Sequence, residues 1–236
     1  MTDLFAYLKQ RPYPGRGILL GNTPGGRRVC AYFIMGRSEN SRNRIFEATE
    51  DGIRTRAYDE SRMTDPSLII YHPVRRAAGK DGVATVVTNG DQTDTVRDAL
   101  FSGRSWLDAL ATRAFEPDGP NWTPRVSGLL WPDGAYLLSI LKAQAGKPDC
   151  CERFYYTYDS PTAGLGHFIS TYEGFGSPLP SFHGEPVAVA LDEADAYTLA
   201  KRLWDALDAE NRVSLYVSVN GDEVILNKNA GEEQTL

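Results

Sequence analysis

Residues 35–44, MGRSENSRNR, combine side chains that suit the binding of a phosphate. Arg37, Arg42 and Arg44 supply guanidinium groups, which pair with phosphate in two-point geometry, and Ser38 adds a hydroxyl donor. The segment directly follows an apolar run and opens with a glycine. It is not a Walker loop, because GxxxxGK[ST] is absent. These residues indicate an anion-binding loop, and an exposed polar connection is the alternative.

A second polar segment, VVTNGDQTDT at residues 86–95, leads from a predicted strand to a predicted helix. The free N–H groups at the start of a helix suit an anion or a carbonyl oxygen. Asn89, Gly90 and Thr93 are therefore candidate binding residues. The alternative is that Asn89 and Gly90 form a simple turn and that Thr93 only caps the helix.

Three further segments carry groups that can move a proton. Tyr71 and His72 end the apolar run 68–70, Glu116 begins the loop that leads to Arg125, and Glu173 ends a predicted strand. Each has a structural alternative, either an aromatic side chain at the rim of the core or a solvated carboxylate.

The elements that must position these residues follow from apolar periodicity and turn residues. Helices are predicted over residues 2–10, 93–102, 105–115 and 192–207. Strands are predicted over residues 18–21, 29–35, 45–48, 53–58, 67–72, 83–88, 126–131, 135–141, 154–158, 167–172, 213–219 and 224–226. Thr93 and Ser105 are the expected N-caps of the two middle helices, and Phe101, Leu107 and Phe115 are expected to face inward.

This order of elements predicts an α+β protein with large antiparallel sheets covered by helices. We expect one domain over residues 1–236, with an N-terminal helix within residues 1–11 and a polar, frayed tail at residues 231–236. Hydrophobic residues make up 42% of the 236 positions and charged residues 24%. Both fractions are typical of a folded globular protein and exclude a largely disordered chain.

The distribution of charge favours a small anionic ligand. The formal net charge is −6, which argues against the broad basic surface of a general nucleic-acid binder. Residues 16–76 nevertheless contain eleven arginines, no lysine and only seven acids. An arginine-only basic region within an acidic protein fits a phosphate-bearing small molecule.

The cysteines and histidines predict no metal site and no disulfide framework. Cys30, Cys150 and Cys151 lack zinc-ligand spacing, and the histidines show no HExxH pattern. An odd number of cysteines fits a reducing compartment. No run approaches the ~20 apolar residues of a membrane span, so we expect no membrane partner and a cytoplasmic location.

Five strings, in this order, resemble the archaeal-type IMP cyclohydrolase family: SRNR, IIYHP, VVTNGDQTDTV, WTPR and FISTYE. The resemblance implies closure of formamido-imidazole-carboxamide ribotide (FAICAR) to IMP with loss of water, in purine biosynthesis. It also implies a four-layered αββα sandwich similar to the N-terminal-nucleophile hydrolases, and no cofactor. The N-terminal helix is an addition to compact members of the family.

Motif position also implies roles for single residues. The catalytic residues of the family fall on Arg44, Tyr71 and Glu116, with Asp118 as the alternative loop carboxylate. The residues implied to bind substrate are Arg37, Ser38, Arg42, Asn89, Gly90, Thr93 and Arg125. Thr2, the one candidate for a processed nucleophile, opens a helical stretch, so we expect no such chemistry.

Two other functions stay open from the sequence: a non-catalytic purine-nucleotide sensor and an amide hydrolase of the related fold. A homo-oligomer is a further expectation, through a sheet edge or exposed aromatics such as Tyr155 and Tyr156.

Overall fold

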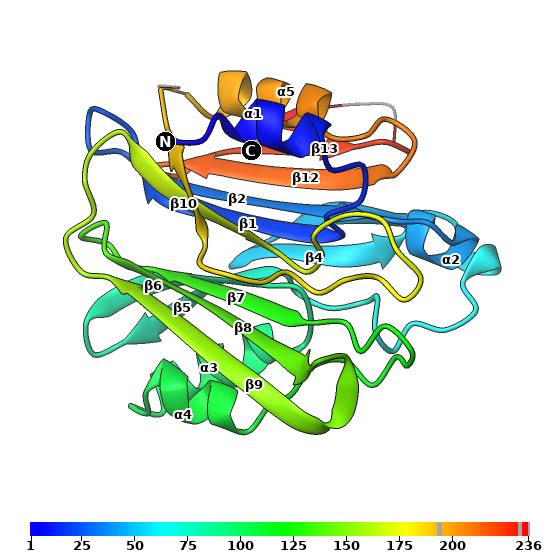
Figure 1. Cartoon of the computed structure of the whole chain (residues 1–236). Coiled ribbons are helices and arrows are strands. Elements are labelled where there is room, and N and C mark those ends of the chain that lie inside the picture. Colours follow the sequence, from blue (N-terminus) through cyan, green and yellow to red (C-terminus); the bar gives the residue numbers. More distant parts are fainter. Residues whose placement is uncertain (193–194, 231–232, 236) are drawn as a thin grey trace.

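The computed structural model describes residues 1–192, 195–230 and 233–235. Within them, two seven-stranded antiparallel sheets lie face to face, and Figure 1 shows helices on the outer face of each. The α+β class and the antiparallel sheets predicted from the sequence are therefore confirmed.

The first sheet joins both ends of the chain. Its strands, in spatial order, are β11 (Val187–Ala190), β10 (Leu165–Ser170), β1 (Arg16–Asn22), β2 (Arg28–Met35), β12 (Arg212–Val219), β13 (Asp222–Asn227) and β14 (Glu233–Thr235). The predicted strands over residues 18–21 and 29–35 form the hairpin β1–β2, and those over residues 213–219 and 224–226 form the hairpin β12–β13. Where the sequence suggests a frayed tail, β14 pairs with β13, and residues 231, 232 and 236 lie outside the described residues.

The second sheet follows the chain order. Its strands are β3 (Arg44–Thr49), β4 (Gly52–Ala57), β5 (Val74–Gly79), β6 (Gly82–Thr88), β7 (Arg125–Leu130), β8 (Tyr136–Gln144) and β9 (Lys147–Tyr158). The predicted strand over residues 67–72 is wrong. The Pro66 carbonyl accepts from the N–H groups of Ile69 and Ile70 at 3.1 and 3.0 Å, which makes the apolar run a turn. The neighbouring strand β5 begins only after Pro73 and was not predicted.

The helices pair up on the outer faces of the sheets (Figure 1). α1 (Leu4–Lys9) and α5 (Ala196–Ala206) pack on the first sheet, and α3 (Gln92–Phe101) and α4 (Trp106–Ala111) pack on the second. Two short turns, α2 (Glu39–Arg42) and η1 (Glu60–Arg62), lie in the connections around β3 and β4. The predicted start of α5 includes residues 193–194, which lie outside the described residues.

Three details of the predicted helices are wrong. Ser105 caps α4 with a capping box, as expected, but α3 begins before Thr93, with Asp91 at the N-cap position. Phe101 and Leu107 are 80% and 48% exposed rather than inward. Each directly follows an inward residue, and one position along a helix turns the side chain by roughly 100°.

Asn227, the last residue of β13, bridges the two sheets. Its Nδ2 donates to the carbonyl of Phe46 at 2.9 Å, and its Oδ1 accepts from the Phe46 N–H at 2.8 Å. The Ser214 hydroxyl donates to the same Oδ1 at 2.7 Å. Phe46 lies on β3, at the edge of the second sheet, so one amide satisfies the free backbone groups of that edge.

We expect Asn227→Ala to leave the N–H and carbonyl of Phe46 buried without partners. The free energy of unfolding should fall by about 2–3 kcal/mol, measured by urea denaturation. In the control Asn40→Ala, which removes hydrogen bonds at the surface, the loss should be about 0.5 kcal/mol or less. Equal losses in the two variants would contradict a bridging role for Asn227.

Candidate active site

Two buried arginines begin neighbouring structural elements at one end of the sheets. Arg16 is the first residue of β1 and Arg44 the first residue of β3. The side chain of Arg16 is 12% exposed and Arg44 is 1% exposed. Arg44 donates from Nε to the Ser41 carbonyl at 2.8 Å and from Nη2 to the Met35 carbonyl at 3.3 Å.

Each of these arginines also keeps one buried N–H, Nε of Arg16 and Nη1 of Arg44, without a hydrogen-bond partner among the described residues. Buried donors are nearly always satisfied in folded proteins. Arg16 and Arg44 line the same cavity, so these two donors indicate a site for an oxygen atom of a ligand.

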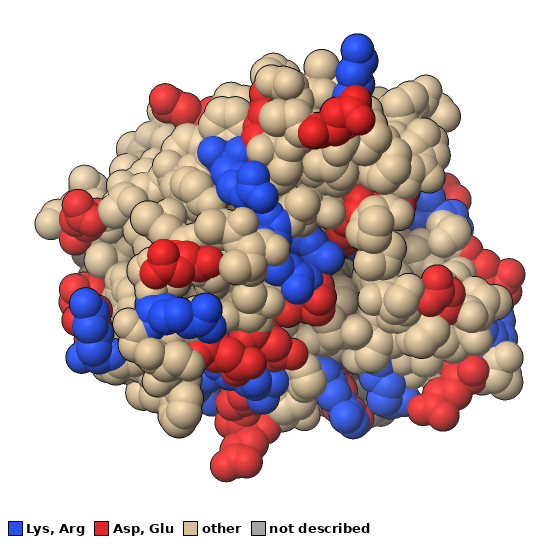
Figure 2. All heavy atoms as spheres, turned by 90° about the horizontal axis from the view of Figure 1, so that it is seen from below, with Lys and Arg blue, Asp and Glu red and all other residues tan. Residues whose placement is uncertain are grey.

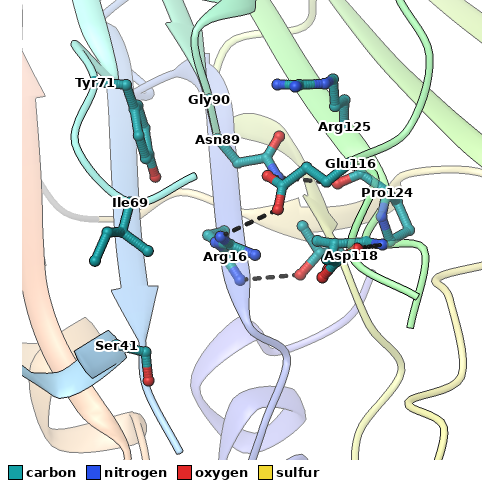
Figure 3. Close-up of polar contacts among 12 residues, drawn as sticks. Arg16, Ser41, Ile69, Tyr71, Asn89, Gly90, Glu116, Asp118, Pro124 and Arg125 are labelled. Atoms are coloured by element: carbon teal, nitrogen blue, oxygen red, sulfur yellow. Dashed lines mark hydrogen bonds and ion pairs between the residues drawn. The ribbon is translucent and has the colours of Figure 1, made fainter. Parts of the chain in front are cut away.

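Glu116 is the carboxylate that faces Arg16 (Figure 3). Its Oε2 lies 3.5 Å from Nη2 of Arg16, and its Oε1 accepts from Nδ2 of Asn89 at 3.4 Å. Burial raises the pKa of Glu116, and the attraction of Arg16, Arg125 and Arg44 offsets only part of that shift. A carboxyl group with a raised pKa exchanges its proton more readily near neutral pH.

The site carries a surplus of positive charge. Burial alone would lower the pKa of Arg16, but Glu116 and nearby phenols raise it well above its usual value. Burial lowers the pKa of Arg44; the phenol of Tyr71 opposes this shift, and the charge of Arg16 adds to it. Because arginine stays protonated in proteins, two cations share one buried carboxylate. This imbalance favours an anionic ligand or a developing negative charge.

Tyr71 lies beside both arginines, and its ring points toward Arg16 in Figure 3. It is 7% exposed, and its hydroxyl lies 2.8 Å from the hydroxyl of Tyr32. The backbone of Tyr71 is fixed on Thr55 of β4: its N–H donates to Oγ1 of Thr55, and its carbonyl accepts from the Thr55 N–H, both at 2.8 Å. The structure therefore brings Arg44, Tyr71 and Glu116 together around Arg16.

Two cavities meet at this place. The smaller, of about 230 Å³, is lined by residues that include Arg16, Arg44, Arg37, Ser38, Ser41, Ile69, Tyr13 and Asp118. The larger, of about 720 Å³, is lined by residues that include Arg54, Arg56, Ile70, Tyr71, His72 and Asp91. Residues 69–71 thus separate the two spaces.

Of the predicted phosphate ligands, Arg37 and Ser38 line the smaller cavity. The guanidinium of Arg37 is exposed and lies 4.8 Å from the ring centroid of Tyr13. Arg42 does not line this cavity: it donates from Nε to the Gly36 carbonyl at 2.9 Å and from Nη2 to Oδ1 of Asn211 at 3.0 Å.

The other predicted binding residues are buried behind Glu116. Asn89 donates from Nδ2 to the Pro124 carbonyl at 2.9 Å, and Arg125 donates from Nη1 to Oε1 of Gln92 at 2.6 Å. These four residues, Asn89, Gly90, Thr93 and Arg125, line neither cavity.

Gly90 leaves room for this packing, because a Cβ there would lie 2.4 Å from Nη1 of Arg125. The hydroxyl of Thr93 lies 2.6 Å from that of Thr88. The structure therefore gives this group of residues a supporting position.

The loop carboxylates Glu116 and Asp118 have different partners. Both oxygens of Asp118 accept hydrogen bonds from Thr123, from its N–H at 2.6 Å and from its hydroxyl. Thr123 in turn contacts the hydroxyl of Tyr172. Glu116 instead carries the ion pair with Arg16, so it is the carboxylate with an oxygen directed at the arginines.

Sequence reasoning missed Arg16 and Tyr32. The position of Arg16 in the sequence could have identified it. It is a single cation at the start of β1, followed by buried residues, and it comes directly after Gly15, whose φ is +77°. Glu173 lies elsewhere, paired with His183 at 3.0 Å, and Thr2 pairs with Val189 of β11.

Other kinds of site find little support. The described residues contain no group of three or more His, Cys, Asp or Glu side chains placed to hold a metal ion. No helix in the described ranges is both long and apolar enough to cross a membrane. The face shown in Figure 2 carries acidic and basic side chains side by side rather than one continuous basic area.

A family model described as "IMP cyclohydrolase-like protein" matches residues 13–224. This chain belongs to that family. A protein from Methanococcus maripaludis named IMP cyclohydrolase is 31% identical over 191 residues, which cover 71% of this chain and 92% of that relative. An IMP cyclohydrolase from Halobacterium salinarum is 29% identical over 192 residues, or 80% of this chain and 86% of the relative.

A shorter alignment joins this member of the IMP cyclohydrolase-like family to the protein of another M. maripaludis strain. It is 31% identical over 130 residues and spans 53% of this chain and 61% of that relative, which is less than two thirds of its length. That relative is also named IMP cyclohydrolase.

The raised pKa of Glu116 predicts how stability changes with pH. The folded chain holds this proton over a range, above the ordinary value of 4.5, in which the unfolded chain has released it. The protonated carboxyl of Glu116 contributes its full stability at a pH below its pKa in the unfolded chain. That contribution is lost as the pH rises through its pKa in the folded chain. We expect wild-type stability to fall relative to Glu116→Gln as the pH rises from 4.5 toward neutrality, measured by urea denaturation.

Asp91→Asn is the control with the opposite sign. Burial opposes the shift, but Arg113 and Arg125 lower the pKa of Asp91 below its ordinary value of 3.8. Wild-type stability should therefore rise relative to this variant as the pH rises from the lowered folded pKa of Asp91 to its ordinary value of 3.8. If wild-type stability instead rose relative to Glu116→Gln, the ion pair with Arg16 would dominate and our assignment of the Glu116 proton would be wrong.

Proposed function

We propose that this chain catalyses the closure of FAICAR to IMP with loss of water. The proposal rests on the grouping of Tyr71 and Glu116 around Arg16 and Arg44. The two arginines line the smaller cavity, and each has a buried nitrogen without a hydrogen-bond partner among the described residues, which leaves it available to a ligand oxygen. The relatives named IMP cyclohydrolase supply the reaction, and this geometry supplies the groups that the reaction needs.

In the first step the carboxamide nitrogen attacks the formyl carbon. A C–N bond forms, and the electrons of the formyl C=O bond move to its oxygen. The free N–H groups of Arg16 and Arg44 stabilise the negative charge that grows there. Holding the two substituents together in the cavity supplies much of the remaining acceleration.

Further proton transfers complete the reaction. Glu116 accepts the proton of the attacking nitrogen and passes it to the oxyanion, which becomes a hydroxyl group. Tyr71 then donates its proton to this hydroxyl, which leaves as water, while the formamido nitrogen forms the C=N bond and releases its own proton to Glu116. After the product leaves, exchange with solvent returns the proton from Glu116 and restores Tyr71. Each step is an addition, an elimination or a proton transfer, so this scheme requires no redox or nucleotide cofactor.

The phosphate of the ribotide is assigned to Arg37 and Ser38, which line the same cavity as Arg16 and Arg44. The exposed guanidinium of Arg37 is available for two-point pairing with phosphate. Arg42 is not assigned to the phosphate, because Gly36 and Asn211 already engage its N–H groups. Asn89, Gly90, Thr93 and Arg125 act by holding the loop of Glu116 in place.

We further propose that the layering is the αββα sandwich of the N-terminal-nucleophile hydrolases, used here without a processed nucleophile. Helices on the outer faces of two facing antiparallel sheets support this assignment. The first sheet combines strands from both ends of the chain, which supports one domain for the whole span.

The direct test incubates the purified chain with FAICAR in EDTA-containing buffer and follows IMP by ultraviolet absorbance. We expect turnover, since the scheme uses only side chains of this protein. Tight binding of IMP without turnover would indicate a purine-nucleotide sensor instead. Release of formate from FAICAR, with no ring closure, would indicate an amide hydrolase.

A second test separates catalysis from binding. Tyr71→Phe keeps the ring but removes the transferable proton, so kcat should fall about 10²–10⁴-fold with little change in KM. Arg37→Ala should mainly raise KM, because phosphate contacts are equal in the ground and transition states. Steady-state kinetics on both variants, with thermal melts beside them, make the comparison. A kcat near that of wild type in Tyr71→Phe would remove Tyr71 from the mechanism.

A further inference from the structure

The hydroxyl groups of Tyr32 and Tyr71 form a pair that joins the core to the site. They lie 2.8 Å apart, and this is the one hydrogen bond of the Tyr32 hydroxyl within the described part of the chain. Tyr32 lies on β2, is fully buried between the sheets and stacks on Phe46 at a centroid distance of 5.7 Å. Its ring is therefore held in place independently of its hydroxyl.

Charged groups surround this pair from the neighbouring elements. Arg16 of β1 and Arg44 of β3 interact electrostatically with both phenols. Glu116 and Tyr172 face Arg16, and Tyr13 faces Arg44. The two cations favour negative charge at the pair, and one phenol oxygen can carry it.

Of the two phenols, Tyr71 is the one placed to give a proton to a substrate. Burial, aided by the neighbouring Tyr71, raises the pKa of Tyr32 well above its usual value, and Arg16 and Arg44 only partly oppose this. Tyr32 therefore stays protonated. Tyr71 lies beside Arg16 and Arg44 and also lines the larger cavity, so a substrate oxygen held by the two arginines is within its reach.

We propose that Tyr32 is a positioning residue, which donates its O–H to the oxygen of Tyr71 whenever Tyr71 has given its proton to the departing hydroxyl. This inference rests on the proposed function, in which Tyr71 protonates the leaving oxygen. The O–H bond of Tyr71 breaks, its proton completes a water molecule, and its electron pair stays on the phenolate. The hydrogen bond from Tyr32 stabilises that phenolate, together with the charges of Arg16 and Arg44.

Tyr32→Phe tests the proposal and keeps the ring that stacks on Phe46. Hydrogen bonds to charged groups contribute about 1.5–3 kcal/mol, so kcat should fall about 10- to 100-fold with KM nearly unchanged. Tyr216→Phe is the matched control. Tyr216 lies directly opposite Tyr32 on β12 and is buried in the same core, but its hydroxyl donates to Glu223 at 2.9 Å. This control should retain kcat.

A spectroscopic readout separates failure of this inference from failure of the proposed function. Phenolate formation is followed at 295 nm against pH. The contribution of Tyr71 is the difference between two titration curves at 295 nm. With Tyr32 present, the curve of Tyr71→Phe is subtracted from that of wild type. Without the Tyr32 hydroxyl, the curve of the variant with both Tyr32→Phe and Tyr71→Phe is subtracted from that of Tyr32→Phe. We expect this contribution to appear at higher pH when Tyr32 is absent, whether or not the chain turns over FAICAR.

The outcomes are distinct. No turnover by wild type, with the spectroscopic change present, would overturn the proposed function and retain the Tyr32–Tyr71 coupling. Identical phenolate curves, or a kcat in Tyr32→Phe equal to that of Tyr216→Phe, would overturn the role of Tyr32. Thermal melts identify any variant that loses its fold, and the spectroscopic pair is then repeated with fluorinated tyrosine at position 32.

Discussion

Arg16 and Arg44 are buried side by side, and a single carboxylate, that of Glu116, compensates them. Burying a guanidinium is costly unless its donors are satisfied, and Nε of Arg16 and Nη1 of Arg44 have no partner within the described part of the chain. The rest of the site is built around this constraint. Backbone carbonyls of Met35 and Ser41 hold Arg44, and a buried shell of polar residues holds Glu116 at the distance that pairs it with Arg16.

The second sheet positions Tyr71, the proton donor that we propose, through an interruption in its own strand pairing. β4 and β5 share only two paired positions, and the chain before β5 turns back along β4 instead. Thr55 bonds both backbone groups of Tyr71: its hydroxyl accepts from the Tyr71 N–H, and its own N–H donates to the Tyr71 carbonyl, so Thr55 replaces a neighbouring strand here. Tyr71 thereby gains a fixed place beside two cations and at the wall of a cavity, which a residue inside a continuous strand would not have.

Sequence reasoning predicted the class of the fold and the residues with chemical groups, because both follow from local patterns. Apolar runs between turn residues located the strands β1, β2, β12 and β13, and Ser105 identified the start of α4. The pattern failed at residues 67–72, since an apolar run between two prolines fits a partly exposed turn as well as a strand. It also failed to show that Arg125 and Asn89 support Glu116 from behind, because that depends on contacts between distant segments. Arg16 and Tyr32 were not named as site residues for the same reason, since their contacts in the site are with residues far along the chain, Glu116 and Tyr71.

In the mechanism that we propose, the N–H groups of Arg16 and Arg44 that have no partner among the described residues hold the reacting end of the nucleotide. A crystal structure of this chain with bound IMP would show where that end lies. We predict that the nucleotide, or a water at the position of the departed oxygen, lies within hydrogen-bonding distance of Nε of Arg16 and Nη1 of Arg44, with the phosphate at Arg37. IMP bound wholly in the larger cavity beside Arg54 and Arg56, with both buried donors still unpaired, would contradict the account.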